Sequence, residues 1–401
     1  MVNVIGLGYI GLPTALMLAA NGIQVVGTDY NSKVVEQLQL NILPFQEAGL
    51  AELFAKANRE GIVFSNAYQV TDTYIIAVPT PYDKLSKKID PNYVIEAIKA
   101  TIEVAKSGAT IVIESTVAPG TIDKFIRPLI ENIGKELHIA HAPERIIPGN
   151  MVYELIHNSR TIGVDDYSIG NTLKTLYSSF CKGDIVITDV RTAEMTKVVE
   201  NTYRDINIAF ANELTQICRT DNMDVYEIIK IANMHPRVNI LQPGPGVGGH
   251  CISVDPWFLV GDYPGLANII LAARKINDSM PAFVLNRIYD ITKERDIDIS
   301  RVGLYGLTYK EDVDDIRESP TLQLLECMER HLAPGLKVYD PFIKTKIVRQ
   351  QISTLNDFLD SVDLVVIMVA HNEIKENIGK LAGKIVLDTR NVPQINAQYK
   401  L

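Results

Sequence analysis

Short apolar runs alternate with longer segments of helical spacing along the first part of the chain. Residues 2–6 are apolar and favour a strand, and residues 12–20 follow with an apolar helical pattern. Further strand-like runs occupy residues 23–28, 74–78, 110–114, 137–140 and 184–188. Runs of this kind, separated by helical segments, predict a parallel α/β sheet that ends near residue 190.

The pattern changes after residue 190. Residues 193–219 contain neither proline nor glycine and mix apolar and polar residues at helical spacing, so they predict one long helix. Residues 221–232 predict a second helix, and residues 268–295 predict one or two more. A helical segment therefore follows the first α/β part, and its long helix offers a surface for dimerisation.

A second α/β part begins at about residue 296. Its strand-like runs are residues 301–305, 337–339, 363–369 and 384–387. Ser319 and Pro320 predict the N-cap and the first residue of a helix that runs to His331. The expected domains are residues 1–192, 193–295 and 296–401, with α/β parts at both ends and a helical part between them.

Composition narrows the range of partners. The 401-residue chain carries a net charge of −9, which argues against a nucleic-acid or an anionic-membrane partner. The sequence shows no signal-peptide layout and no apolar run of membrane-spanning length. The four cysteines are widely scattered, without CxxC or Cys/His metal spacing, so we expect a reduced, cytoplasmic protein with no metal site.

The loop after the first strand has the pattern of a dinucleotide-binding turn. Its residues Gly6, Gly8, Tyr9, Ile10 and Gly11 follow the order GxGxxG between a strand and a helix. The three glycines allow a tight turn, a close approach to a pyrophosphate and close packing of the helix. Asp29 ends the second strand and can accept hydrogen bonds from ribose hydroxyls. Its charge would repel a 2′-phosphate, so NAD is expected rather than NADP, and a glycine-rich turn without a nucleotide is the alternative.

Polar residues follow the ends of several predicted strands. Thr80, Thr116 and Glu144 each come shortly after a strand, at the sheet edge where ligands of open parallel sheets bind. Each of them taken alone could be a helix cap or a turn residue. Together they indicate the lining of a ligand crevice, with Thr80 and Thr116 beside the cofactor. Three cations near strand ends of the second α/β part could hold phosphates, either of the cofactor (Arg317) or of a substrate (Lys310, Arg390). Each of them taken alone is also typical of an ordinary surface charge.

A glycine-rich loop from residue 244 onward leads directly to a cysteine. Gly248 and Gly249 leave a backbone that can approach a ligand closely, and Cys251 stands at the edge of this loop, where a thiolate could attack what is bound there. A glycine-rich turn beside an incidental buried cysteine is the alternative. Asp255 precedes Pro256, which fits a helix N-cap, and Asp255 could equally serve as a base.

A nicotinamide site together with a reactive cysteine indicates a four-electron oxidation. A hydride acceptor takes an alcohol to an aldehyde, and the thiol of Cys251 can add to that aldehyde. Loss of a second hydride then gives a thioester, which water hydrolyses to an acid. Lys197 and Asn201, four residues apart on one helix face, are candidates for holding the oxyanions, unless that face is simply solvated. Asp255 and Glu144 are candidates for the base.

These residues belong to six motifs that resemble the nucleotide-sugar 6-dehydrogenases, the family of the UDP-glucose and GDP-mannose dehydrogenases. The motifs are residues 6–13, 115–121 and 142–145, Lys197 with Asn201, 248–251 with Asp255, and 306–319. The resemblance covers nearly the whole chain. It implies two Rossmann-like doubly wound domains joined by a long-helix central domain, a homodimer, and consumption of two NAD per sugar. It also implies a uronic acid product of the kind used in polysaccharide biosynthesis.

The resemblance also implies roles for individual residues. Cys251 would be the nucleophile, Lys197 and Asn201 the partners of the oxyanion and the alcohol, and Asp255 the activator of water. Thr116 and Glu144 would line the reacting centre. Arg237 would reach the sugar nucleotide of the neighbouring subunit. The expected substrate-binding residues are Glu144, Arg145, Lys197, Asn201, Arg237, Gly248, Lys310 and Arg390.

One departure from the family pattern bears on the substrate. Relatives acting on UDP-glucose commonly have a second glutamate four residues after the one matching Glu144, and this chain has Pro148 there. Arg145 likewise replaces a typical aromatic residue. The run 235–251 followed by 256–258 resembles the branch that acts on UDP-N-acetyl-mannosamine, with UDP-N-acetyl-glucosamine and UDP-glucose as rival substrates. A two-electron β-hydroxyacid dehydrogenase has no use for the third domain. An inactive NAD-binding regulatory protein has no need of the polar groups at the site.

Overall fold

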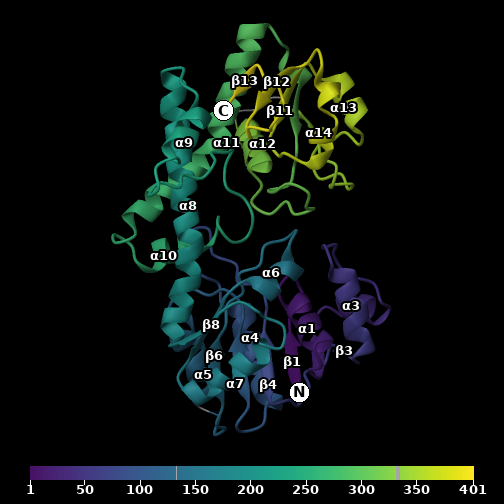
Figure 1. Ribbon diagram of the computed structural model, residues 1–401, viewed down its shortest axis with the longest axis vertical. Helices are drawn as coiled ribbons and strands as arrows, with labels where there is room; N and C mark the ends of the chain where they lie inside the picture. The colour runs from purple at the N-terminus through teal and green to yellow at the C-terminus, as the bar shows by residue number, and fades with distance from the viewer. Residues whose placement is uncertain (132, 331–334) are drawn as a thin grey trace. The chain divides into compact units, whose positions relative to one another are not determined.

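The computed structural model describes residues 1–131, 133–330 and 335–401 (Figure 1). The chain forms two compact units, Met1–Glu200 and Asn201–Leu401. Each unit is built around its own sheet. In the described part of the chain, no helix is both long enough and apolar enough to cross a bilayer.

The first unit contains an eight-stranded sheet with the order β3-β2-β1-β4-β5-β6-β7-β8. The strands are β1 (Val2–Ile5), β2 (Val25–Thr28), β3 (Val63–Ser65), β4 (Thr73–Ile76), β5 (Thr110–Ile113), β6 (His138–His141), β7 (Arg160–Val164) and β8 (Ile185–Thr188). All neighbours pair in parallel except β6 and β7, which are antiparallel. The expectation of a parallel sheet was therefore wrong for the last two strands: β7 and β8 pair in parallel with each other, and both start at the edge where β1 to β6 end.

Helices cover both faces of this sheet, because successive strand residues point to opposite sides. Val4 and Ile75 face one apolar cluster, and Ile5, Tyr74 and Ile76 face the other. The helices are α1 (Gly11–Ala20), α2 (Ser32–Gln39), α3 (Leu50–Arg59), α4 (Asn92–Val104), α5 (Arg127–Glu131), α6 (Met151–His157) and α7 (Tyr167–Tyr177), with a π-helical turn at Ile122–Ile126. Every residue of α1 is buried, so the helix after the glycine loop is part of the core.

The helical segment is built on α8 (Val190–Thr220), which is 31 residues long. It confirms the predicted long helix and extends it at both ends. The other helices here are α9 (Val225–Ala232), α10 (Asp255–Asp262) and α11 (Asn268–Arg295). The segment 268–295, expected as one or two helices, is one helix of 28 residues with Pro281 inside it.

The second unit contains a five-stranded parallel sheet with the order β10-β9-β11-β12-β13. Its strands are β9 (Val302–Tyr305), β10 (Lys337–Tyr339), β11 (Leu364–Ile367), β12 (Ile385–Asp388) and β13 (Tyr399–Lys400), and its helices are α12 (Pro320–Arg330), α13 (Leu355–Ser361) and α14 (Asn372–Glu376). Short 3₁₀ turns lie at Ile299–Arg301 and Ile378–Leu381. The Ser319 hydroxyl accepts a hydrogen bond from the Leu322 N–H at 3.4 Å, which agrees with the predicted N-cap. The predicted end of this helix at His331 lies outside the described residues.

Candidate functional site

The glycine loop of the first unit is shaped by two positions that cannot carry a side chain. Gly6 has φ +89°, and a Cβ there would lie 2.5 Å from the Ala77 carbonyl oxygen. A Cβ on Gly11 would lie 1.8 Å from the Gly6 carbonyl oxygen. Gly8 differs, because a Cβ there would meet nothing within 4 Å. The backbone at Gly8 therefore faces open space one turn before α1, where a pyrophosphate is expected.

Asp29 ties the glycine loop to the second strand. Its carboxylate accepts hydrogen bonds from the Leu7 N–H and the Asn31 N–H, each at 2.8 Å. Each carboxylate oxygen has two lone pairs, so both retain capacity for a ribose hydroxyl. The open backbone at Gly8 and this acceptor fit NAD, and Gly6, Gly8, Gly11 and Asp29 are the residues that would hold it. Thr80 is half-buried beyond the end of β4, and Tyr9 packs against Phe45 with ring centroids 4.4 Å apart.

Alanine at Gly8 and at Gly11 should separate binding of the cofactor from folding. Gly8→Ala is expected to leave the free energy of unfolding unchanged and to weaken NAD binding by about tenfold or more, because the added methyl group occupies the space for the pyrophosphate. Gly11→Ala should instead cost about 2 kcal/mol or more of stability, since its Cβ meets backbone. Urea unfolding and NAD titration measure the two effects. Wild-type NAD affinity in Gly8→Ala would show that the pyrophosphate lies elsewhere.

Glu144 lies in a buried ionic cluster of the first unit. Its carboxylate pairs with the Arg160 guanidinium, and it accepts a hydrogen bond from the Arg145 N–H at 2.7 Å. Arg160 also lies 3.4 Å from Glu114, and both side chains are almost fully buried. Arg160 begins β7, and the antiparallel direction of β7 brings it to the edge where β5 and β6 end. Neither Arg160 nor Glu114 was predicted as a site residue from the sequence, although Glu114 is a charge at the end of a predicted apolar run.

Burial raises the pKa of Glu114 to about 7, against the opposing effect of Arg160 and with a further contribution from the charge of Glu144. The Tyr177 hydroxyl donates to Glu114 at 2.8 Å and the Thr14 hydroxyl donates at 3.2 Å. The Arg160 guanidinium is thus the charge partner of two buried carboxylates, Glu114 and Glu144. Near neutral pH Glu114 therefore carries a proton part of the time, and Glu144 forms an ion pair with Arg160.

Glutamine at Glu114 should flatten the pH dependence of stability. The pKa of Glu114 is about 7 when folded against an ordinary 4.5, so the folded state binds more protons between these values. The stability contributed by Glu114 is therefore fully present below about pH 4.5 and is lost as pH rises to about 7. We expect the wild-type melting temperature to fall more steeply from pH 5 to pH 8 than that of Glu114→Gln, by a few degrees. Glu52→Gln on the exposed face of α3 is the control, and parallel curves for all three proteins would contradict the assignment.

The other predicted residues of this unit have different surroundings. Thr116 is half-buried after β5, in a segment held by Glu194, whose carboxylate accepts from the Gly120 N–H at 2.5 Å and the Ile122 N–H at 2.9 Å. The Arg145 guanidinium donates to Glu200, to the Ser159 carbonyl and to Thr161. Its nitrogens are thus engaged within the chain, and its predicted contact with a substrate stays a prediction.

In the second unit the glycine loop before Cys251 packs against another segment of the chain. A Cβ on Gly248 would lie 2.6 Å from both the Tyr309 Cβ and the Glu318 carbonyl oxygen, and one on Gly249 would lie 2.8 Å from the Tyr309 ring. The Gly249 N–H donates to the Arg317 carbonyl at 2.9 Å. The close approach that these glycines permit is thus made to Tyr309, where the sequence suggested a ligand.

Cys251 is half-buried at the start of a tight turn into α10. Its carbonyl accepts from the N–H groups of Val254 and Asp255 at 3.0 and 2.9 Å. It forms no disulfide. The His250 Nδ1 lies 3.9 Å from the Asp315 carboxylate. The turn fixes Cys251 one helical turn from Asp255.

Asp255 is buried and hydrogen-bonded to Asn201, another of the predicted site residues. The Asn201 amide donates to its carboxylate at 2.6 Å. The helix begins at Asp255 itself, with Val254 at the N-cap position and without a side-chain cap there, so the N-cap interpretation of Asp255 was wrong. Lys197 is buried one turn before Asn201 along α8, which excludes the solvated-face alternative for both residues. A buried carboxylate bonded to an amide, one turn from a thiol, can activate water or take a proton.

The predicted cations of the second unit are spread over several loops. Arg317 pairs with Asp315, and its own exposed surface is 46%. The Arg390 guanidinium reaches Gly244, where a Cβ would lie 2.7 Å from it. Arg237 is exposed, and Lys310 is half-buried in the loop after β9. Arg390 is thus the cation beside the glycine loop, a position suited to a phosphate.

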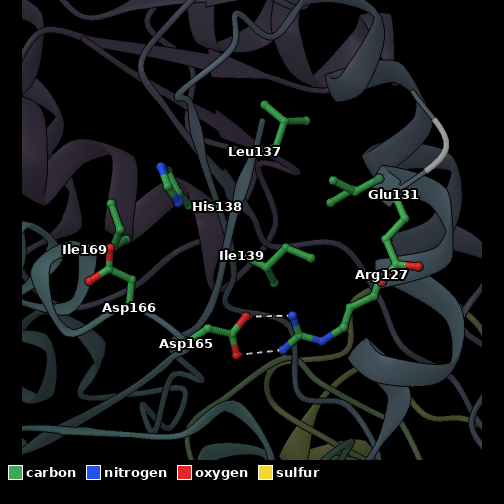
Figure 2. A pocket seen from close by; sticks show the side chains of 9 residues that line it. Arg127, Glu131, Leu137, His138, Ile139, Asp165, Asp166 and Ile169 are labelled. Carbon is green, nitrogen blue, oxygen red and sulfur yellow. Dashed lines mark hydrogen bonds and ion pairs between the residues drawn. The ribbon is translucent and has the colours of Figure 1, made fainter. Parts of the chain in front are cut away.

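A separate cavity of about 170 Å³ lies in the first unit, at the end of the sheet where β6 begins (Figure 2). His138, Leu137 and Ile139 line it, beside the ion pair of Arg127 and Asp165. The glycine loop and the segments after β4 and β5 leave the opposite end of the sheet, so this cavity is distinct from the candidate site. In the described part of the chain, no group of three or more His, Cys, Asp or Glu side chains is arranged to hold a metal.

Comparison with known proteins covers both units. Models of the UDP-glucose/GDP-mannose dehydrogenase family match in three segments: the NAD binding domain at residues 1–181, the central domain at 191–279 and the UDP binding domain at 303–394. The UDP-N-acetyl-D-mannosamine dehydrogenase of Methanococcus maripaludis is 43% identical over 97% of this chain and 92% of its own length.

Two solved structures show the same fold. The UDP-N-acetyl-mannosamine dehydrogenase of Staphylococcus aureus is 39% identical with a TM-score of 0.87, covering 100% of this chain and 97% of that one. The UDP-D-ManNAc dehydrogenase of Pyrococcus horikoshii is 36% identical with a TM-score of 0.90, covering 100% and 98%. This likeness confirms the expected architecture of two Rossmann-like domains with a helical central domain.

Proposed function

The chain belongs to the UDP-glucose/GDP-mannose dehydrogenase family, and from this premise we propose that it oxidises the C6 hydroxyl of UDP-N-acetyl-D-mannosamine to the uronic acid with two NAD. The observation that carries the chemistry is Cys251, one helical turn from the buried pair of Asp255 and Asn201. The substrate is supported by the names of relatives that are about 40% identical over nearly the full chain.

The reaction proceeds in two oxidations and one hydrolysis. In the first oxidation the C6 hydroxyl loses its proton and C6 loses a hydride, which gives an aldehyde. NAD, when bound, supplies the hydride acceptor for each oxidation. The Cys251 thiolate then adds to the aldehyde carbon, and the new oxyanion takes up a proton. This thiohemiacetal loses its hydroxyl proton and the remaining hydride of C6, which leaves a thioester on Cys251.

Hydrolysis completes the cycle. Water adds to the thioester carbon, the C–S bond breaks, and the Cys251 thiolate and the carboxylic acid are released. Asp255 takes the proton from the attacking water, and Asn201 orients the Asp255 carboxylate through their 2.6 Å hydrogen bond. Lys197 stabilises the oxyanions of the two additions. Glu144 serves as the further carboxylate of the reacting centre, with its charge balanced by Arg160.

A substrate panel tests the proposed specificity. The purified protein is incubated with NAD and with UDP-N-acetyl-mannosamine, UDP-N-acetyl-glucosamine, UDP-glucose or GDP-mannose, and NADH absorbance is followed. We expect UDP-N-acetyl-mannosamine to give the highest kcat/KM. A higher value for another sugar would replace the substrate and leave the reaction class in place. NAD binding without turnover of any sugar would favour the inactive regulatory protein.

We also propose that the protein is a homodimer formed through α8. Val199, Tyr203, Phe210 and Ile217 are 46%, 64%, 49% and 52% exposed. Their spacings of four and seven residues place them on one face of the helix, as in a coiled-coil seam. A continuous apolar stripe on a long helix is typical of a surface that packs against a second copy.

Glutamate in this stripe should dissociate the dimer. Phe210→Glu places a charge in the proposed interface, and we expect its mass in light scattering to fall from that of a dimer to that of a monomer at micromolar concentration. Lys230→Glu on the exposed face of α9 introduces the same charge away from the stripe and should remain dimeric. A dimeric Phe210→Glu protein would place the interface elsewhere. A monomeric wild-type protein would contradict the proposed dimer.

The expected cytoplasmic location and a role of the uronic acid in polysaccharide biosynthesis complete the proposal. The scattered cysteines support the first, and the resemblance stated above supports the second. Fractionation of producing cells tests the location. Loss of uronic acid from the cell polysaccharide on deletion of the gene tests the role.

A further inference from the structure

The two sheets share a structural feature that the sequence does not reveal as a repeat. In the first unit Gly6 has φ +89°, and the Leu7 N–H donates to Asp29 at 2.8 Å. In the second unit Gly306 has φ +101°, and the Leu307 N–H donates to Asp340 at 2.6 Å. Both acids follow the strand that pairs with the glycine-bearing strand, β2 beside β1 and β10 beside β9. Asp340 is therefore the structural counterpart of the ribose-binding acid.

Asp340 is nevertheless occupied by the protein itself. Its carboxylate also accepts from the Thr308 N–H at 3.1 Å and from the Phe342 N–H at 2.8 Å. The His371 Nε2 lies 3.2 Å from it, and the side chains of Asp340 and His371 are fully buried. A buried carboxylate with four such partners is not available to a ribose. In the second unit this acid instead holds the backbone of the loop that follows β9.

The hydrogen bonds of His371 define which of its ring nitrogens carries the proton. The Asp312 N–H donates to His371 Nδ1 at 2.9 Å, so Nδ1 carries a lone pair. The proton of the neutral ring is therefore on Nε2, which faces Asp340 and the Thr308 hydroxyl at 3.2 and 3.3 Å. The Asn372 N–H in turn donates to the Asp312 carboxylate at 3.0 Å. One imidazole thus connects both ends of the segment 308–312.

This segment lies between the sheet and the cysteine loop. Tyr309 fills the space left by Gly248 and Gly249, with its ring 2.8 Å from where a Cβ of Gly249 would be. The Thr308 hydroxyl donates to the Lys310 carbonyl at 2.9 Å, which fixes the backbone that carries the Lys310 side chain. A shift of residues 308–312 would therefore move both the support of the cysteine loop and Lys310.

We propose that His371 is a positioning residue: Asp340 orients its ring at Nε2, and by accepting from the Asp312 N–H at Nδ1 it holds residues 308–312, so that Tyr309 supports the Cys251 loop and Lys310 is presented to the substrate. The part concerning Lys310 rests on the proposed function. The part concerning Tyr309 and Cys251 rests on contacts within the second unit alone.

Two substitutions distinguish the hydrogen bond at Nδ1 of the imidazole from the one at Nε2. In His371→Asn the amide oxygen takes the place of Nδ1 and can still accept from Asp312. In His371→Gln the amide nitrogen can take the place of Nε2 and still donate to Asp340, while the acceptor for Asp312 is lost. We expect His371→Gln to raise KM for the nucleotide sugar by about tenfold, the effect of one lost buried hydrogen bond, with NAD affinity unchanged. His371→Asn should stay within about threefold of wild type, because the acceptor for Asp312 is kept and Asp340 retains its three backbone N–H donors.

Alkylation of Cys251 provides a readout that does not depend on the substrate. Iodoacetamide labelling, with the site identified by mass spectrometry, should be several-fold faster at Cys251 in His371→Gln than in wild type or His371→Asn, because the loop loses its support. If the wild-type protein turns over no nucleotide sugar, the proposed function is wrong. The difference in labelling rate then still tests the role of His371.

The remaining outcomes decide the proposal. Equal KM values and equal labelling rates in the two variants would overturn it, and so would lower melting temperatures without a change in either readout. Thr308→Val is a milder variant, to be used if His371→Gln does not fold. It removes the hydroxyl bonded to Lys310 and His371 and should raise KM with an unchanged fold. A wild-type KM in a folded Thr308→Val protein, together with wild-type labelling, would likewise contradict the positioning role.

Discussion

Replacing Cys251 with serine is expected to lower turnover of the nucleotide sugar by about 10⁴-fold or more, with NAD affinity unchanged. A serine hydroxyl is far less ionised than a thiol near neutral pH, and an ester is a poorer intermediate for hydrolysis than a thioester. The variant should therefore stall before or after the covalent step. Stopped-flow NADH absorbance and mass spectrometry of the protein measure both possibilities.

Cys327→Ser is the matched control for this result. Cys327 is half-buried on α12 in the same unit and has no place in the proposed site. It should turn over as wild type does. Ordinary turnover in Cys251→Ser would remove the cysteine from the mechanism, whatever the substrate proves to be.

Asparagine at Asp255 should block the last step selectively. The substitution keeps the shape of the side chain and an oxygen that can accept from Asn201, but it removes the base. We expect hydrolysis of the thioester to slow by about 10²- to 10⁴-fold, with a rapid burst approaching two NADH per site and an acyl adduct on Cys251. Intact-protein mass spectrometry after quenching detects the adduct.

Asp262→Asn is the control, because Asp262 is exposed at the end of the same helix. It should show neither the burst nor the adduct. If Asp255→Asn shows no burst and no adduct, Asp255 acts before the thioester forms. The assignment of water activation to this residue would then be wrong.

Much of the fold was predictable because it depends on local patterns. The strand, GxGxxG turn and helix around Gly6, Gly8 and Gly11 are contiguous, and each glycine has a local steric reason. The long helix α8 was predictable because its apolar spacing is regular. The strand β7 was not among the predicted runs, and the direction of β7 and β8 was not predictable, since a short apolar run carries no information about its neighbours in the sheet.

Part of the candidate site was likewise predictable from local sequence, and part was not. Cys251, Asp255 and Asn201 were identified from residue type and spacing, and the structure brings Asp255 and Asn201 together. The interpretation of Asp255 as an N-cap failed because the helix starts one residue earlier than the proline suggested. Arg160, Glu114 and His371 were missed. Their partners lie far away in sequence, and only the order of the strands brings them together.

A four-electron oxidation through a thioester on Cys251 requires two NADH for each sugar consumed, and this ratio can be measured. A limiting, known amount of UDP-N-acetyl-mannosamine is taken to completion with excess NAD, and the product is identified by mass spectrometry. We expect two NADH per sugar and a uronic acid without free aldehyde. One NADH per sugar with an accumulating aldehyde would contradict it.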